Sequence, residues 1–527
     1  MPGLTETLRE RARSHPDRVA YIAGDTEITY GDFDRRADRV AAALAALGVG
    51  RGDRVAILDK NSIEHAEQLF GAARIGAVQV PVNYRLAPDE VAHIVNDARA
   101  KVFVVGADFV PVLDAIADRL EHTAHTMVIG GSGHGPDHEY ADYTAWVDAA
   151  ADAPPEPGYV TDTADVFAQL YSSGTTGLPK GVMLTHDNYF AALTVTNTAW
   201  NVKATSVLMV AMPMYHVAGN MLTLSAIHNG IPGVIAREPD PTLIARGIER
   251  HRVTHIFLVP VLLQFMPLIP DVTACDMSSL ELMLYGASPI SEDVLRGAMR
   301  LLPDTDFIQV YGLTEVTGAI VMLPPEDHDP DGPNAHRLRS AGLPIDSCTL
   351  RIVDPATQEE LPTGQVGEIL CRTPQNMKGY WGKPEATATA LSDDNWFRTG
   401  DAGYLDEDGY LYIHDRVKDM IISGGENIYP AEVENVLMGH PAIGDCAVIG
   451  VPDDKWGETP KAIVVLTPDA GDVTDKDIIG YCRDHLAHFK CPTTIERREA
   501  IPRNLTGKIL KRELRAPYWE GQERQVH

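Results

Sequence analysis

The sequence is poor in cysteine, and no pattern joins the few cysteines that it has. Only six occur among 527 residues, at positions 275, 348, 371, 446, 482 and 491, and no two form a C-x-x-C pair. The spacing offers neither the ligands of a structural zinc site nor a disulfide framework. We therefore expect reduced thiols in a cytoplasmic protein.

Long apolar runs are also missing. The N-terminal segment 1–18 is polar and charged, which argues against a secretory signal. The most apolar stretch, residues 257–270, contains Gln264 and three prolines and is too short to span a bilayer. It predicts buried core, and we expect no transmembrane segment.

An excess of positive charge is absent as well. Acidic residues outnumber basic ones by 74 to 45, and the formal net charge is -29. Such a surface repels phosphate backbones at long range, so nucleic-acid binding is not expected. Any polyanionic ligand must be held by a local group of donors.

What is present is the composition of a globular protein, in a chain too long for one ordinary core. Helix-type and strand-type patterns alternate in the first third. Helices are predicted over 33–47 and 63–75, each closed by a glycine, and strands over 54–58 and 77–82. Short apolar strands between helices predict a parallel sheet covered on both faces.

A second, smaller domain is predicted to begin after residue 416. Residues 404–413 form a hairpin pattern, and a charged, glycine-containing segment follows before Pro430 opens a helix. We predict an α/β fold: a large N-terminal domain, residues 1–416, of parallel or mixed sheets covered by helices, and a small mobile α+β lid domain, residues 417–527.

Residues 171–182, YSSGTTGLPKGV, carry the most informative pattern. Glycines let the backbone turn tightly and bring N–H groups close to an anion, while hydroxyls and Lys180 add further donors. The segment is not a Walker A loop, because Pro179-Lys180-Gly181 stands where G-K-[ST] is required. It suits a triphosphate; the alternative is a flexible surface turn.

This string resembles the phosphate loop of the AMP-forming adenylating enzymes, a family that includes acyl-CoA synthetases, adenylation domains of peptide synthetases and beetle luciferases. The resemblance covers nearly the whole chain. Its further motifs follow in the family's order: 213–216 (PMYH), 285–288 (YGAS), 311–315 (YGLTE), 399–401 (TGD), 415–418 (DRVK) and 502–508 (PRNLTGK).

The resemblance implies ATP, Mg²⁺ and coenzyme A as cofactors. The residues that it assigns to ATP or AMP are Ser172, Ser173, Gly174, Thr175, Thr176, Gly177, Lys180, Gly286, Ala287, Ser288, Tyr311, Gly312, Thr314, Asp401 and Arg416. Asp401 would accept hydrogen bonds from the ribose hydroxyls. Glu315 and Thr175 are the implied Mg²⁺ ligands, because oxygen donors suit a hard cation.

The implied catalytic residues are Lys508, Glu315, Thr175 and His216. Negative charge grows on the transferring group when a carboxylate attacks the α-phosphate, and a positioned ammonium such as that of Lys508 stabilises it. The alternative for Lys508 is a solvated lysine in a basic patch. The alternative for His216 is an ordinary core residue.

The same resemblance implies the sites for CoA and for the acid. The CoA-binding residues are Ser423, Gly424, Gly425 and Glu426, and Lys418 is the hinge of the lid. The acyl-binding residues are His216, Val217, Gly219, Asn220, Gly312 and Gly318. Small and apolar side chains dominate these segments, which favours an alkyl, aryl or polycyclic tail. Asn220 would bond either a polar substituent or nearby backbone.

The sequence thus predicts a carboxylate–CoA ligase that works through an acyl-adenylate and takes a medium- or long-chain fatty acid or a hydrophobic aryl or polycyclic acid. Two alternatives stay open: a stand-alone acyl or aryl adenylation enzyme that loads a carrier protein, and a luciferase-like oxygenase. Residues 212–224 contain no Asp or Glu to pair with an ammonium, which argues against an α-amino acid substrate. The sequence also leaves a homodimer open.

Overall fold

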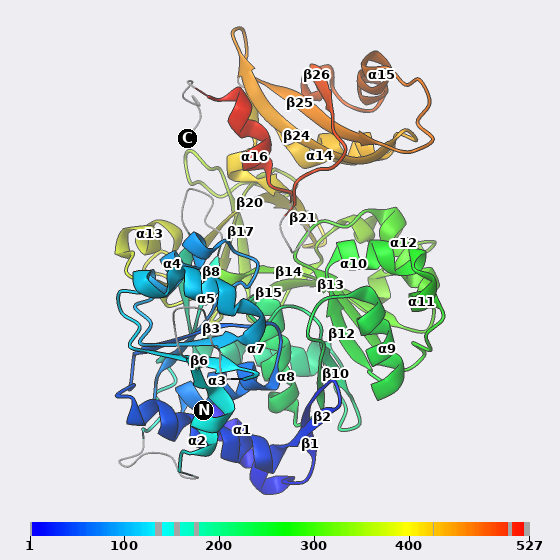
Figure 1. Ribbon diagram of the computed structural model, residues 1–527. Coiled ribbons are helices and arrows are strands. Elements are labelled where there is room, and N and C mark those ends of the chain that lie inside the picture. Colours follow the sequence, from blue (N-terminus) through cyan, green and yellow to red (C-terminus); the bar gives the residue numbers. More distant parts are fainter. Residues whose placement is uncertain are drawn as a thin grey trace.

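The computed structural model describes residues 3–131, 140–151, 159–172, 179–424, 426–503 and 509–520. Figure 1 shows a large body of sheets and helices with a smaller part at one end, formed by about the last fifth of the chain. The predicted α/β class, with a large N-terminal and a small C-terminal domain, is confirmed.

One half of the large body is built on an eight-stranded sheet of order β19-β9-β8-β4-β3-β5-β6-β7. Its strands are β3 (Arg54–Leu58), β4 (Val78–Pro81), β5 (Val102–Gly106), β6 (His125–Ile129), β7 (Ala141–Asp142), β8 (Val166–Ser172), β9 (Lys180–Thr185) and β19 (Gly379–Tyr380). The strands are parallel except at β8–β9 and β9–β19.

The helices beside this sheet begin where the sequence offers a capping side chain. Helix α2 (Tyr30–Ala46) follows Thr29, whose hydroxyl accepts from the N–H of Asp32, and α3 (Ile63–Ala73) follows Ser62, which caps the N–H of His65. Both predicted helices are confirmed, although α2 starts earlier than its apolar stripe. Helices α4 (Pro88–Asp97), α5 (Val110–Ile116) and α6 (Tyr143–Asp148) belong to the same half.

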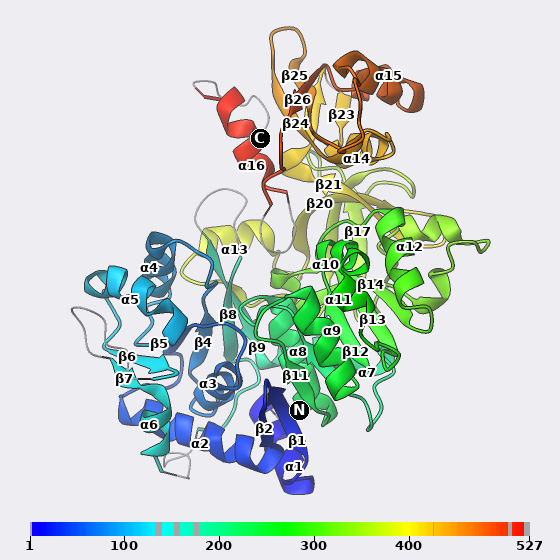
Figure 2. The same cartoon turned by 45° about the vertical axis from the view of Figure 1, so that its right-hand side comes forward.

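The other half is built on a nine-stranded sheet of order β16-β15-β14-β13-β12-β10-β11-β1-β2. Its strands are β1 (Val19–Ala23), β2 (Thr26–Thr29), β10 (Leu208–Val210), β11 (Gly233–Ile235), β12 (His255–Leu258), β13 (Leu282–Gly286), β14 (Asp306–Leu313), β15 (Gly318–Leu323) and β16 (Leu343–Pro344). Figure 2 shows the two halves side by side.

Helices in this second half are α1 (Leu4–Ser14), α7 (His186–Ala199), α8 (Val217–Asn229), α9 (Pro241–His251), α10 (Pro260–Phe265), α11 (Pro270–Thr273) and α12 (Glu292–Leu301). Helix α8 is buried all along from Gly219 to Ile227 and packs against α7, β10 and β15. A helix that is enclosed on every side has no polar face, which is why its sequence lacks an amphipathic stripe.

The predicted burial of residues 257–270 is wrong in part. The segment divides into buried β12 and a surface piece that begins at Pro260, where α10 starts and a 3₁₀ turn follows. Phe265 and Leu268 are exposed at 49% and 71%. A proline-initiated helix on the surface turns one face outward, and an apolar run alone does not reveal which residues lie there.

A third, four-stranded sheet connects the large body to the small domain. Its order is β17 (Thr349–Val353), β18 (Gly367–Arg372), β20 (Phe397–Leu405) and β21 (Leu411–Arg416). Strands β20 and β21 are antiparallel neighbours, which confirms the predicted hairpin. Helix α13 (Pro384–Ala390) precedes β20.

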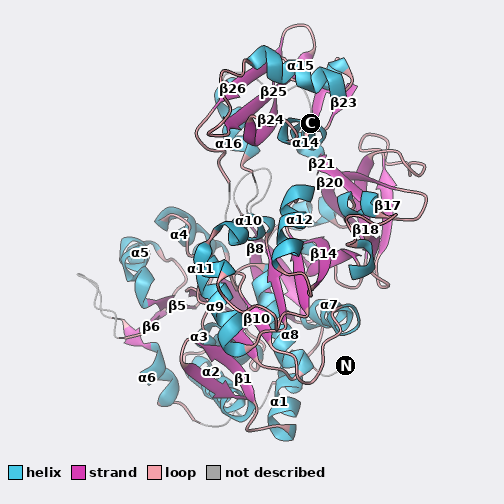
Figure 3. Ribbon diagram, turned by 90° about the vertical axis from the view of Figure 1, so that its right-hand side faces the viewer, coloured by secondary structure: helices cyan, strands magenta, loops and turns pink. Residues whose placement is uncertain are grey.

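The small domain carries a five-stranded sheet made of β22 (Ile421–Ser423), β23 (Glu426–Ile428), β24 (Ile443–Asp453), β25 (Gly457–Leu466) and β26 (Thr494–Arg497). Helices α14 (Pro430–Met438), α15 (Asp475–His485) and α16 (Lys511–Arg515) accompany it. In Figure 3 this domain stands beyond β20 and β21, at the end of the molecule opposite α1. Among the described helices, none is long and apolar enough to cross a membrane.

Candidate active site

The predicted phosphate loop joins two paired strands of the eight-stranded sheet. Ser172 ends β8 and Lys180 begins β9, and the two residues face each other in the antiparallel ladder. The two ends of the predicted loop therefore lie side by side. The predicted residues Ser173, Gly174, Thr175, Thr176 and Gly177 lie outside the described residues, so their roles stay predictions.

Glu315 lies directly against the beginning of this predicted loop. It sits in the 3₁₀ turn Thr314–Val316 after β14, and its Oε1 accepts from Ser172 Oγ at 3.0 Å and from Tyr380 OH at 3.1 Å. The Lys180 ammonium stands 5.0 Å from the centroid of the Tyr380 ring. The structure thus brings three predicted residues together and adds Tyr380, which sequence reasoning missed.

The carboxylate of Glu315 fits the predicted Mg²⁺ role. Its Oε1 accepts two hydroxyl protons, while the described residues place no donor on Oε2. Mg²⁺ on a nucleotide takes one or two carboxylates and keeps water and phosphate oxygens as its other ligands, so a single carboxylate is enough. The second predicted ligand, Thr175, lies outside the described residues.

Tyr311, Asp401 and Arg416 form a connected group where β14 meets β20 and β21. Tyr311 OH donates to Asp401 Oδ2 at 2.7 Å, and Arg416 Nε lies 2.7 Å from Asp401 Oδ1. The N–H of Asp401 donates to Thr399 Oγ1 at 3.0 Å. Sequence reasoning named the first three residues from separate motifs, and the structure brings them into one contact.

This group keeps its phenol neutral and its guanidinium charged. Burial and the neighbouring Asp401 charge hold the pKa of Tyr311 far above its ordinary value. Burial opposes the charge of Arg416, but the neighbouring Asp401, Tyr311, Glu315 and Asp419 together outweigh it and raise the pKa of the guanidinium. A buried anion held between a phenol and a guanidinium is fixed in orientation and ready to accept further hydrogen bonds from a diol.

The third predicted nucleotide segment follows β13. Gly286 ends that strand, and a Cβ there would lie 2.1 Å from the carbonyl oxygen of Val310 on β14, so only glycine fits. Ala287 has φ of +69°, an uncommon conformation for a residue with a side chain. Ser288 follows, half-buried. Strained backbone at the carboxyl end of a parallel strand is typical of a binding edge.

The predicted acyl-binding residues lie at α8 and at the paired strands β14 and β15, of which β15 contacts α8. His216 is the N-cap residue of α8, and a Cβ on Gly219 would lie 2.2 Å from the carbonyl oxygen of Pro213. A Cβ on Gly312 would lie 1.7 Å from the carbonyl oxygen of Gly318, and one on Gly318 would lie 3.7 Å from Met221 Cγ. Glycines therefore allow the close approach of α8 to Pro213 and of β14 to β15.

Two polar side chains stand in this apolar region. Burial lowers the pKa of His216 to about 4, which keeps the imidazole neutral at pH 7. Asn220 is 1% exposed, and among the described residues neither its Oδ1 nor its Nδ2 has a hydrogen-bond partner. The neighbouring Val217 is half-buried.

The predicted CoA-binding residues lie in the turn between β22 and β23. Ser423 pairs with Glu426 across the turn, Gly424 has φ of +61°, and its N–H donates to the carbonyl of Trp456 at 2.9 Å. The Trp456 side chain is 47% exposed and lies against Gly424, where a Cβ would come within 2.7 Å of the ring. Sequence reasoning missed Trp456, because nothing near it in the chain marks a site.

Three further predicted residues, Gly425, Lys508 and Lys418, keep the roles that the sequence predicts for them as predictions only. Gly425 and Lys508 lie outside the described residues. Lys418 belongs to the 3₁₀ turn Val417–Asp419, which follows β21 and precedes β22. A turn between two sheets suits a hinge, and the role of Lys418 stays a prediction.

Comparison with known proteins agrees with this geometry. The family model "AMP-binding enzyme" matches residues 8–381, and "AMP-binding enzyme C-terminal domain" matches residues 432–508. Relatives with 38% identity include a fatty acid–[acyl-carrier-protein] ligase of Streptomyces coeruleorubidus (99% of this chain, 98% of the relative), a long-chain-fatty-acid–CoA ligase of Mycobacterium tuberculosis (98% and 99%) and a feruloyl-CoA synthase of Amycolatopsis sp (97% and 98%).

Solved structures match over the whole length as well. A Mycobacterium tuberculosis fatty acyl CoA synthetase is 35% identical with a TM-score of 0.78, and ATP-bound MatB from Rhodopseudomonas palustris is 28% identical with a TM-score of 0.87; each match covers 99% of both chains. ATP and CoA are substrates of this family. The chain therefore belongs to the AMP-binding enzyme family, as an AMP-forming acyl-CoA synthetase.

Proposed function

We propose that this enzyme activates a hydrophobic carboxylic acid, a medium- or long-chain fatty acid or an aryl or polycyclic acid, and passes it to CoA. The observation that carries the proposal is the uncharged and mostly apolar wall formed where α8 packs against β15. His216 is neutral there, Met221 approaches Gly318, and no acidic or basic side chain occurs in α8 itself apart from the weakly basic His228. Such a wall favours an apolar tail.

The proposed reaction has two steps. A carboxylate oxygen attacks the α-phosphorus of ATP, a P–O bond forms, and pyrophosphate leaves with the electron pair of the broken bond. The sulfur of CoA then attacks the acyl carbonyl, AMP leaves with the electron pair of the C–O bond, and the thiol proton passes to solvent. Adenylation converts a poor leaving group into a good one.

We assign the roles in these steps as follows. Asp401 holds the ribose hydroxyls, with Tyr311 and Arg416 fixing its carboxylate. Glu315 would hold Mg²⁺, which would neutralise phosphate charge. Lys508 stabilises the charge that grows at the α-phosphate. The lid comprises residues 417–527 and turns about Lys418, so that Lys508 serves the first step and Ser423, Gly424, Gly425 and Glu426 serve the second.

The test is pyrophosphate release with a panel of acids. Octanoate, palmitate, ferulate and a bile acid would be compared with acetate and an α-amino acid, each with and without CoA and Mg²⁺. We expect release with one or more apolar acids, formation of the acyl-CoA only when CoA is present, and no reaction without Mg²⁺. Preference for acetate or an amino acid would contradict the proposed pocket.

A carrier protein is the second candidate for the acceptor of the acyl group. The supporting observation is the relative of Streptomyces coeruleorubidus, which matches the chain from end to end at the same 38% identity as the CoA-dependent relatives. The same assay decides: acyl transfer to a phosphopantetheinylated carrier protein, with none to free CoA, would establish carrier loading in place of CoA ligation.

A further inference from the structure

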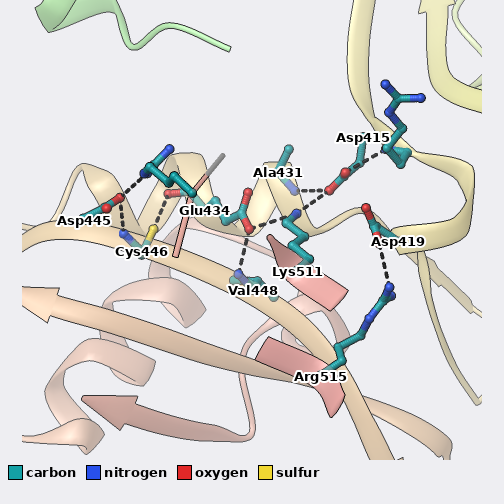
Figure 4. A network of polar contacts seen from close by, with 11 residues as sticks. Asp415, Asp419, Ala431, Glu434, Asp445, Cys446, Val448, Lys511 and Arg515 are labelled. Atoms are coloured by element: carbon teal, nitrogen blue, oxygen red, sulfur yellow. Dashed lines mark hydrogen bonds and ion pairs between the residues drawn. The ribbon is translucent and has the colours of Figure 1, made fainter. Parts of the chain in front are cut away.

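The small domain contains a buried lysine that is shared between two carboxylates. Lys511, the first residue of α16, is 8% exposed, and its Nζ lies 2.9 Å from Asp415 Oδ2 and 3.0 Å from Glu434 Oε1. Figure 4 shows the ammonium between the two acids. A buried charge is stable only when it is paired, so three side chains depend on one another here.

The two carboxylates come from opposite sides of the predicted hinge. Asp415 lies near the end of β21, which pairs with β20, whereas Glu434 lies on α14 of the small domain. Asp415 Oδ2 also accepts from the N–H of Ala431 at 3.1 Å, and Glu434 Oε1 accepts from the N–H of Val448 at 2.7 Å. Lys511 therefore joins the interior of the small domain to the last strand before the hinge.

The strand side of this contact adjoins the nucleotide site. Asp415 immediately precedes Arg416, whose N–H donates to Asp415 Oδ1 at 2.7 Å and whose guanidinium binds Asp401. A second ion pair runs parallel to the first, because Arg515 Nη2 on α16 lies 2.9 Å from Asp419 Oδ1. Helix α16 thus forms ion pairs with Asp415 and Asp419, which lie on either side of Lys418.

The other side of the contact adjoins the segment that carries Lys508. Arg503 and Ile509 form an antiparallel bridge, and the N–H of Leu510 donates to the carbonyl of Pro502 at 2.9 Å. These contacts hold together the two ends of segment 504–508, and Lys511 follows Leu510 directly. Arg503 is itself fixed by Asp445 at 2.7 Å. Fixing Lys511 therefore fixes the base of that segment.

We propose that Lys511 is a positioning residue for adenylation: by binding Asp415 across the hinge, it sets the base of the Lys508-bearing segment beside the Asp401–Arg416 group. The inference rests on the proposed role of Lys508. Rotation about Lys418 moves Lys511 relative to Asp415, so the contact belongs to one orientation of the lid. Loss of the Lys511–Asp415 contact therefore weakens adenylation, the half-reaction that uses Lys508. Thioester formation loses no contact, because it takes place in another orientation of the lid.

The test measures adenylation and thioester formation separately in three variants, Asp415→Asn, Lys511→Met and Lys511→Arg. Asp415→Asn leaves the Lys511–Glu434 pair inside the small domain intact, so it keeps the lid folded even if Lys511→Met does not. We expect acid-dependent pyrophosphate exchange to fall at least about tenfold in Asp415→Asn and Lys511→Met, since small misplacement of a catalytic group has effects of that size or larger. Acyl-CoA formation from presynthesised acyl-AMP should change less than about threefold.

A charge-conserving variant and a control variant show whether the loss is specific to the Lys511–Asp415 contact. Lys511→Arg keeps the charge and should recover most of the exchange rate. Lys490→Met is the matched control, because the Lys490 ammonium forms its ion pair with Glu432, at 2.7 Å, within the small domain; both half-reactions should stay unchanged. Equal losses in both half-reactions, or no loss in Asp415→Asn, would overturn the inference. Failure of the wild-type enzyme itself in either assay would instead count against the proposed function.

Discussion

At the scale of single residues, Asp401 is the carboxylate on which the proposed nucleotide site depends most directly. Asp401→Asn keeps its shape but removes the charge that Tyr311 and Arg416 share. We expect kcat/KM for ATP to fall by roughly 10- to 100-fold, because charge-assisted hydrogen bonds contribute about 1.5–3 kcal/mol. Steady-state kinetics with varied ATP checks this.

Tyr311→Phe serves as the milder companion of that variant. It removes one hydrogen bond to Asp401 and leaves the ion pair with Arg416, so the loss in kcat/KM for ATP should be several-fold smaller. The KM for the acid should hardly change in either variant. A larger change in the KM for the acid than in kcat/KM for ATP would mean that Asp401 belongs to the acid subsite and not to the nucleotide subsite.

Asn220 offers a test of what the acid carries besides its carboxylate. Its amide is buried with no partner in the described part of the chain, and an unsatisfied buried group costs about 1–3 kcal/mol. Asn220→Leu should therefore raise the thermal midpoint of the free enzyme. If Asn220 meets a polar substituent, the variant should also lose kcat/KM for hydroxylated acids while keeping it for plain alkyl acids. An unchanged ratio between the two classes would assign Asn220 a structural role only.

The residues of this site were predictable to different degrees. Tyr311, Asp401, Arg416 and Glu315 belong to motifs that the sequence displays, and the structure brings them together. Tyr380 was missed because its hydrogen bond to Glu315 depends on β19 pairing with β9, a contact that no local pattern encodes. Trp456 was missed for the same reason, since it meets Gly424 only through the pairing of β22 with β25.

At the scale of secondary-structure elements, the closest approach in the site is between β14 and β15. A Cβ on Gly312 would lie 1.7 Å from the carbonyl oxygen of Gly318, and backbone cannot yield as a flexible side chain does. We expect Gly312→Ala to lower the free energy of unfolding by roughly 2–4 kcal/mol and to abolish most activity. Chemical denaturation and the pyrophosphate assay measure the two effects.

Gly480 gives that variant a matched control. It lies in α15, and a Cβ added there would have none of the described neighbours within 4 Å, so Gly480→Ala meets no obstacle. Alanine is favoured over glycine in a helix interior by about 1 kcal/mol, and the control should be slightly stabilised with full activity. Similar behaviour of the two variants would mean that β14 and β15 can separate without consequence.

Helices and strands whose apolar pattern and caps lie within their own sequence were predictable. Elements whose burial depends on residues far away in the chain were not. Strand β3 matches its predicted range, and α2 and α3 lie where the apolar stripes and caps indicate. The segment after β12 shows the limit, because the same apolar composition fits a buried strand and the surface helix α10. Only the position of neighbouring elements decides how much of such a run is covered.

At the scale of the whole molecule, neutral histidines that the fold shields from water connect folding to pH. Burial lowers the pKa of His186, His216 and His328 to about 4 and that of His65 to about 3. In the unfolded chain each has an ordinary pKa near 6.5. Between these values the unfolded state binds protons that the folded state does not, so stability is complete above pH 6.5 and falls as the pH drops toward 4.

His65 is the residue that isolates this effect best. Its ring is 1% exposed on α3, and neither ring nitrogen has a hydrogen-bond partner within the described ranges, so no such bond offsets burial. At pH 5 its share of the destabilisation is about 2 kcal/mol relative to pH 8. His65→Leu keeps the volume and removes the titration, so the loss of stability between pH 8 and pH 5 should shrink by about that amount. Urea denaturation of the variant, the wild type and the exposed-site variant His122→Gln at both pH values measures it. An unchanged pH dependence in His65→Leu would mean that the ring reaches solvent or a partner in the folded enzyme.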